Sequence, residues 1–170
     1  MLARYETIFK WMLYAAAALL CFVVQWAVVQ RFTVWGVIPF LYPLTAVIPA
    51  SYEGPIPGTI FALCMGILCD LLLPEALPCL FTLTFPLVGL NSALLGKSLL
   101  PTGFVCSLVG SAIAFLLIDG FRCLLMWFGG ESVWDAGMWL MLREFCVTAP
   151  LTIPATLLFQ AVHRKVHAND

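Results

Sequence analysis

The stretch GTIFALCMGILCD, which runs from Gly58 to Asp70, joins an unbroken apolar run to a regular series of small residues. Gly58, Ala62, Gly66 and Asp70 recur at every fourth position, and that spacing keeps them on one face of a helix. Small residues in such a series let a second helix approach closely within a membrane. The stretch therefore predicts a membrane-spanning helix with one face packed against another helix or against a partner protein.

Asp70 ends this series shortly before Pro74, and two interpretations of its carboxylate stay open. In the first, Asp70 is a buried polar anchor for a partner or for the end of a neighbouring helix. In the second, it caps its own short span near the outer membrane interface. Both interpretations keep the carboxylate away from lipid, where an ionised side chain is costly.

The composition of the whole chain agrees with a membrane protein. Its 170 residues are 63% hydrophobic and only 10% charged, whereas soluble domains are about half apolar and about one quarter charged. The net charge of −1 supplies no basic surface for a nucleic acid. The length fits a single transmembrane domain over residues 1–170, with no soluble domain beside it.

Six apolar segments approach the roughly 20 residues that a spanning helix needs. We predict an all-α polytopic fold with six transmembrane helices at about 11–30, 34–51, 58–73, 79–95, 104–128 and 138–162. The second segment carries Pro39, Pro43 and Pro49. Because each proline removes a backbone donor, this second helix should be kinked or partly unwound.

The distribution of lysine and arginine predicts the orientation, since cytoplasmic loops carry an excess of both. If the N-terminus is cytoplasmic, the inner side holds five basic residues and the outer side one: Arg4, Lys10, Lys97, Arg164 and Lys165 against Arg31. The outer loops hold acidic residues instead: Glu75, Glu131 and Asp135. We therefore predict that both termini are cytoplasmic. A re-entrant second segment would move Lys97 and the tail outside and weaken this bias.

Four charged residues fall inside the last two apolar segments. Asp119 and Arg122 are three positions apart in the fifth segment, so they share one helix face and can pair. Arg143 and Glu144 enter the sixth segment at a similar depth. We predict one intramembrane cluster of these four residues, which either pins the fifth helix to the sixth or forms a patch that binds a partner or ligand. By comparison, the first and fourth segments are plain apolar helices.

The usual groups of catalytic and metal-binding residues do not occur. Both histidines, His163 and His167, follow the last apolar segment, and none of the seven cysteines forms a Cys-x-x-Cys pair. No Ser/His/Asp set, phosphate-binding glycine loop or metal-ligand spacing is present. We expect a protein that is not an enzyme and that holds no cofactor and no metal.

Two runs of residues resemble the rod shape-determining protein MreD family: Gly54-Pro55-Ile56-Pro57-Gly58 and Gly66-Ile67-Leu68-Cys69-Asp70-Leu71-Leu72. Members of that family show a glycine-punctuated start of the third span, which ends in a Gly-Leu-x-x-Asp-Leu-Leu type stretch. The layout of six apolar segments with short loops is similar along the whole chain. By this resemblance, Gly58, Gly66 and Asp70 are the motif positions.

The resemblance implies a non-enzymatic scaffold of the bacterial inner membrane. Such a protein takes part in cell-shape control and in lateral peptidoglycan synthesis as a member of the cell-elongation machinery. Its expected partner is an MreC-like protein with a single membrane span, together with other proteins of the elongation complex. The family's fold is similar to that of the substrate-binding subunits of energy-coupling-factor vitamin transporters.

That second likeness supplies an alternative function of a different class. In a vitamin-binding transporter subunit, the charges of the fifth and sixth segments would hold the ligand. Such subunits typically carry an Ala-x-x-x-Ala face on their first helix, where the coupling subunit docks. Here the four alanines from Ala15 to Ala18 are consecutive, and none has an alanine four positions further on. This departure favours the scaffold.

Overall fold

The computed structural model of the chain describes residues 2–73, 79–130 and 134–167, and within them the all-α prediction is confirmed. The predicted turn at 74–78, with Glu75, and the loop residue Glu131 lie outside the described residues. One isolated backbone bridge joins Val34 to Val37. The helices are α1 (Leu2–Ala27), η1 (Val29–Arg31), α2 (Tyr42–Glu53), α3 (Pro55–Leu72), α4 (Leu80–Ser98), α5 (Phe104–Phe128), α6 (Trp134–Thr148), η2 (Ala149–Leu151) and α7 (Thr152–His167).

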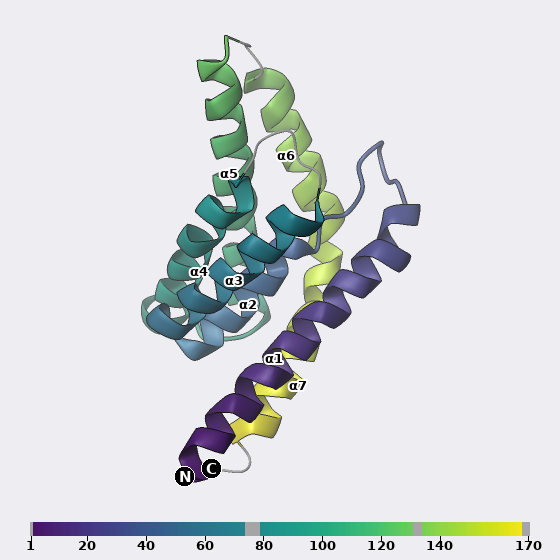
Figure 1. Cartoon of the computed structure of the whole chain (residues 1–170). Helices are drawn as coiled ribbons and strands as arrows, with labels where there is room; N and C mark the ends of the chain where they lie inside the picture. The colour runs from purple at the N-terminus through teal and green to yellow at the C-terminus, as the bar shows by residue number, and fades with distance from the viewer. Residues whose placement is uncertain (1, 74–78, 131–133, 168–170) are drawn as a thin grey trace.

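Helices α1 and α7 lie side by side as an antiparallel pair, so the first residues of α1 and the last of α7 share one end of the molecule (Figure 1). We call this the termini end. Helices α2, α3 and α4 pack against one another, and α2 and α4 also pack against α5. Helix α6 runs beside α5 and leads into α7 (Figure 1). One cluster of buried apolar side chains draws on α1 to α5 and α7.

Five of the predicted segments form helices that are long and apolar enough to cross a membrane. They are Thr7–Arg31, Pro55–Leu72, Leu80–Ser98, Phe104–Phe128 and Trp134–Val166. The fifth predicted segment, 104–128, agrees with α5 at both ends. In length and composition, these five helices agree with the predicted membrane protein.

The second predicted segment, 34–51, is not one spanning helix. Residues 32–41 are not helical, and only Tyr42–Glu53 forms α2. Twelve residues measure about 18 Å at 1.5 Å per residue, which is short of the roughly 30 Å of bilayer hydrocarbon. The helical part alone is therefore too short to span the bilayer, and the residues before it include a tight turn closed by the Val34–Val37 bridge. That this segment crosses the membrane stays a prediction. Pro43 stands in the first turn of α2, where its missing N–H costs nothing. A kink at Pro49 stays a prediction.

The sixth predicted segment, 138–162, is interrupted rather than continuous. Helix α6 ends at Thr148, a 3-10 turn covers Ala149–Leu151, and α7 begins at Thr152. Pro150 and Pro154 explain the interruption, because neither residue can donate the backbone hydrogen bond that an α-helix requires there. The predicted kink concerns the prolines of the second segment, whereas Pro150 and Pro154 have no part in the predicted fold.

The series of small residues faces other helices of the same chain. A Cβ atom at Gly66 would lie 2.5 Å from the carbonyl oxygen of Phe81, in α4, and one at Gly58 would lie 2.6 Å from Cα of Ala50, in α2. Ala62 is fully buried. The predicted close approach of a second helix is confirmed, and α2 and α4 are the elements that approach.

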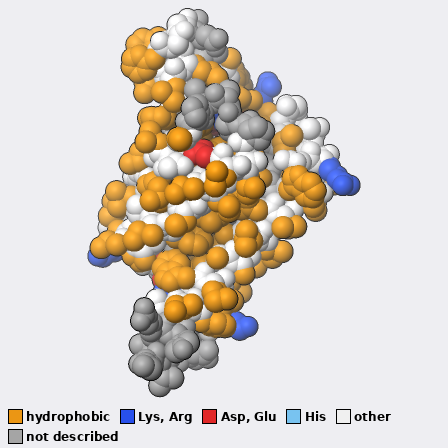
Figure 2. Space-filling model, viewed as in Figure 1, with side chains coloured by type: hydrophobic (Ala, Val, Ile, Leu, Met, Phe, Trp, Pro, Cys, Tyr) orange, Lys and Arg blue, Asp and Glu red, His pale blue; other side chains and the backbone are white. Residues whose placement is uncertain are grey.

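The outer surface of the helices is apolar. Large hydrophobic side chains stay exposed along several of them, including Val23, Ile60, Leu116 and Leu157. Figure 2 shows hydrophobic side chains across the middle of one face, with lysine and arginine side chains at its margins. Such a surface suits a bilayer, in which apolar side chains need no cover from water.

Basic residues gather at the termini end. Lys10 forms an ion pair with Glu53, the last residue of α2. Gly96, next to Lys97, lies against Ser51 in the final turn of α2. Arg164 and Lys165 occupy the last turns of α7. These residues therefore lie on one side of the molecule, as the loop charges predict.

We predict that Gly66→Ala destabilises the protein, because the added methyl group would press on the backbone of α4. The expected loss is about 1–3 kcal/mol, the usual cost of overpacking. Gly120→Ala is the matched control, since a Cβ there meets nothing within 4 Å. Thermal unfolding of the purified proteins in detergent measures both changes. An equal melting temperature for the two variants would contradict the tight α3–α4 contact.

Candidate functional site

Asp70 caps the neighbouring helix α4. Its Oδ1 accepts a hydrogen bond from the Phe81 N–H at 3.0 Å, and its Oδ2 accepts one from the Thr82 N–H at 2.7 Å. Cys79, the residue before α4, gives no side-chain cap of its own. The first turn of a helix has unpaired N–H groups and a partial positive charge, and a carboxylate satisfies both. Of the two interpretations of Asp70, the anchor for a neighbouring helix end is the one that the structure shows.

The unwound part of the second crossing is held by side chains from two other helices. Gln25 is 2% exposed; its Nε2 donates to the carbonyl of Pro39 at 2.8 Å and its Oε1 accepts the Leu41 N–H at 3.0 Å. The Phe40 N–H donates to Oγ1 of Thr148 at 2.9 Å. Non-helical backbone at membrane depth survives only where such partners satisfy it. Gln25 and Thr148 therefore stabilise the non-helical backbone at residues 39–41 by satisfying its hydrogen-bonding groups.

Neither Gln25 nor Thr148 is among the predicted site residues. The first segment is predicted to be a plain apolar helix, and in the sixth only the charged residues have a predicted role. A signal was present, however. A segment with three prolines must find hydrogen-bond partners elsewhere, and Gln25 is one of the few polar residues inside the apolar runs.

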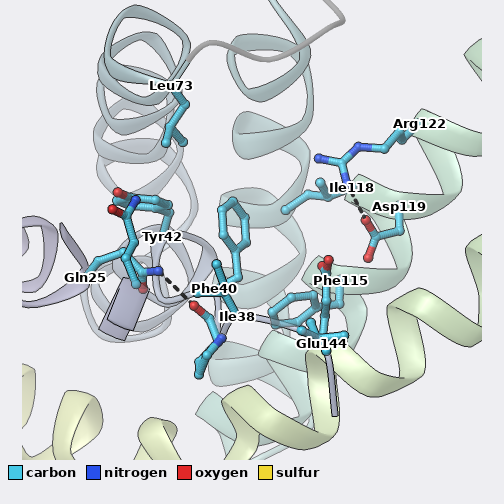
Figure 3. Close-up of a pocket in the computed structure, with 14 residues that line it drawn as sticks. Gln25, Ile38, Phe40, Tyr42, Leu73, Phe115, Ile118, Asp119, Arg122 and Glu144 are labelled. Atoms are coloured by element: carbon cyan, nitrogen blue, oxygen red, sulfur yellow. Dashed lines mark hydrogen bonds and ion pairs between the residues drawn. The ribbon is translucent and has the colours of Figure 1, made fainter. Parts of the chain in front are cut away.

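A cavity of about 340 Å³ lies next to the unwound segment. Figure 3 shows Gln25 and Tyr42 on one side of it, Asp119 and Arg122 on the opposite side, and Phe40 between them. Glu144 of α6 also lines this cavity. The residues that form the wall come from α1, η1, the unwound segment, α2, the residue that follows α3, α5 and α6.

The structure brings three of the four predicted cluster residues to this cavity. Asp119 and Arg122 form the expected pair along α5, with 3.4 Å between Oδ1 and Nη1, and Asp119 is 6% exposed. Glu144 joins them at the cavity wall. Arg143 does not line the cavity; it is exposed, and its guanidinium lies 5.7 Å from the ring centre of Trp139 on the same helix. Three of the four predicted residues therefore line the cavity, and Arg143 lies outside it.

A second polar cluster occupies the termini end. Glu53 is almost fully buried and pairs with Lys10 of α1. Nδ1 of His163 lies 3.6 Å from Glu53 Oε1 and 3.2 Å from the hydroxyl of Tyr14. The ring of Tyr52 lies 4.9 Å from the imidazole of His163. The cluster ties α1, α2 and α7 together.

This second cluster is not among the predicted sites, since His163 follows the last predicted apolar segment and Glu53 lies between two of them. Both residues are helical, at the end of α2 and in α7. The topology offered a signal. Lys10, Glu53 and His163 all flank apolar segments on the predicted inner side, so opposite charges there were free to meet.

No protein-family model, no curated protein and no solved structure matches the chain.

We predict that Asp70→Ala destabilises the protein by about 1–3 kcal/mol, because it leaves two N–H groups at the start of α4 without an acceptor. Asp70→Asn, which keeps one carbonyl oxygen, should lie in between. Asp135→Ala, at an exposed first-turn aspartate of α6, is the control. Melting temperatures of the purified variants test the order. Equal values for Asp70→Ala and Asp135→Ala would show that the cap carries no stability.

We also predict that Asp119→Asn and Arg122→Gln each reduce accumulation in the membrane, because each removes one member of the ion pair along α5. One charge at a helix centre costs about 2.5–3.5 kcal/mol on the insertion scale. The double variant should recover part of the loss, since it removes both charges. Arg143→Gln, at an exposed site, serves as the control. Strictly additive losses in quantitative blots of membrane fractions would rule out an energetic coupling between Asp119 and Arg122.

Proposed function

We propose that this chain is a non-enzymatic scaffold of the bacterial cell-elongation machinery in the inner membrane, with both termini in the cytoplasm. In this role it binds an MreC-like partner with one membrane span. It thereby helps to couple the cytoskeletal filament inside the cell to peptidoglycan synthesis outside. The proposal rests first on the two runs at the ends of α3 that resemble the MreD family.

The geometry of those runs supports the proposal. Gly54 has a φ of 93°, a backbone conformation that favours glycine, and it forms the sharp turn between α2 and α3. Gly58 and Gly66 admit α2 and α4 against α3, and Asp70 caps α4. The motif residues therefore act as one unit that builds the α2–α3–α4 group. This packing and capping role requires no catalytic group, which agrees with a scaffold.

An apolar groove between α1 and α3 suits the span of such a partner. Its volume is about 570 Å³, and it is lined by Trp11, Ala15, Leu19, Pro57, Ile60, Phe61, Cys64, Met65 and Leu68. The rings of Trp11 and Phe61 stack 5.7 Å apart and join the two helices there. The α3 wall from Pro57 to Leu68 is about 16 Å long. Ala15 and Cys64 are small enough to let one face of an added helix come close.

A second candidate function is the substrate-binding subunit of an energy-coupling-factor vitamin transporter. The observation that favours it is the cavity with Asp119, Arg122 and Glu144 in its wall. Uptake measurements separate the two functions. Depletion of a scaffold should turn rod-shaped cells round, whereas depletion of a transporter subunit should leave rods that fail to take up one vitamin.

We predict that a tagged copy of the chain retains an MreC-like protein during purification from membranes, and that Ala15→Trp lowers the retained amount at least about tenfold by filling the groove. A tenfold loss corresponds to about 1.4 kcal/mol. Ala16→Trp is the matched control, since Ala16 is the next residue, is exposed and does not line the groove.

Both variants must first accumulate and melt like the unchanged protein. Equal retention by Ala15→Trp and Ala16→Trp would place the partner elsewhere on the surface. Failure of the unchanged protein to retain any MreC-like protein, with rods unaffected by depletion, would overturn the scaffold proposal itself.

A further inference from the structure

The cavity beside the unwound segment is lined by more acidic than basic side chains. Its wall contains two carboxylates, Asp119 and Glu144, and one guanidinium, Arg122. Whatever pairs form among these three groups, the sum of their formal charges is −1. The other lining residues are uncharged: Gln25, Gln30, Gly36, Val37, Ile38, Pro39, Phe40, Tyr42, Leu73, Phe115 and Ile118.

This charge lies well inside the apolar span. Asp119 is nine residues before the end of α5 at Phe128, which corresponds to about 13 Å along the helix. Asp119 is also 6% exposed. A net charge in such surroundings is costly, and intramembrane ionisable groups typically mark a binding site or a pathway. A cation in the cavity would balance the charge and lower that cost.

The remainder of the wall indicates what kind of cation fits. A volume of about 340 Å³ lies at the lower end of the range for small-molecule sites. Polar and apolar side chains both line the cavity, and three aromatic rings contribute to it: Phe40, Tyr42 and Phe115. Aromatic faces attract organic cations, and apolar side chains favour a carbon body. A bare metal ion would instead require a shell of oxygen ligands.

The unwound segment gives the cavity a fixed wall. The Phe40 and Leu41 N–H groups and the Pro39 carbonyl are engaged by Thr148 and Gln25. These backbone groups therefore hold the wall in place. The charged side chains on the opposite side, visible in Figure 3, are the ones that can distinguish one ligand from another.

We propose that this cavity binds a small organic ammonium compound, with the ammonium group near Glu144 and Asp119 and the carbon body against Phe40, Phe115 and Ile118. Arg122 offers a place for a carboxylate on the same molecule. The inference is independent of the scaffold function. In the vitamin-transporter alternative it would limit the solutes to those that carry a positive charge.

The test is direct binding to the full-length protein in lipid nanodiscs, measured by titration calorimetry. Phenethylammonium and choline are the cationic probes, and β-alanine is a probe with both charges. 2-Phenylethanol and 3-phenylpropanoate match phenethylammonium in shape but are neutral and anionic. We expect at least one cationic or doubly charged probe to bind, and at least about tenfold more tightly than the neutral and anionic ones.

Glu144→Gln should weaken the binding of that probe at least about tenfold, because it brings the charge of the wall to zero. Asp135→Asn removes the same charge from an exposed site on the same helix that lies outside the cavity, and it should leave the affinity unchanged. If Glu144→Gln fails to accumulate, Phe115→Leu replaces it, with the cationic probe expected to weaken more than the neutral one.

Three results would overturn the inference. The first is no binding of any cationic or doubly charged probe at millimolar concentration. The second is equal affinity for phenethylammonium and 2-phenylethanol, which would indicate simple partition into the apolar phase. The third is an affinity that Glu144→Gln and Asp135→Asn change to the same extent. A failed co-purification with an MreC-like protein leaves all these measurements as they are, so the two proposals fail separately.

Discussion

The two hydrogen bonds between Gln25 and the backbone at Pro39 and Leu41 are the contacts on which the rest of this structure depends. In a bilayer, a backbone group without a partner costs several kcal/mol, so an extended stretch cannot face lipid. Gln25 and Thr148 remove that cost. Because they do, the second predicted segment can be helical in its later part only, and a cavity remains beside the non-helical part.

The short helix α2 follows from the same constraint. Ten of its twelve residues are buried, and it packs against α1, α3, α4, α5 and α7. Its far end, at Glu53, is fixed by Lys10 and His163. Polar contacts thus secure the second crossing at both ends, whereas apolar packing encloses its middle. The α3–α4 pair, joined through Gly66 and Asp70, forms one wall of this enclosure.

Much of the fold could be predicted from sequence because apolar length and charge asymmetry are local signals. The bounds of α5 and the face formed by Gly58, Gly66 and Asp70 follow from spacing alone. The break at Pro150 and the role of Gln25 did not follow. Both depend on which segments become neighbours, and a residue pattern within one helix carries no such information. For the same reason, Arg143 was grouped with Glu144, although neighbouring residues on a helix point in different directions.

The enclosure of α2 has a consequence for how the chain enters the membrane. A helix of twelve residues is shorter than the segments that insert into lipid independently, and its extended approach would expose bare backbone groups there. Gln25 in α1 precedes this region in the chain, but Thr148 follows it by 108 positions. The hydrogen bond between Phe40 and Thr148 can therefore form only after the last apolar segment has been synthesised. The non-helical segment thus receives its full set of hydrogen-bond partners late in the synthesis of the chain.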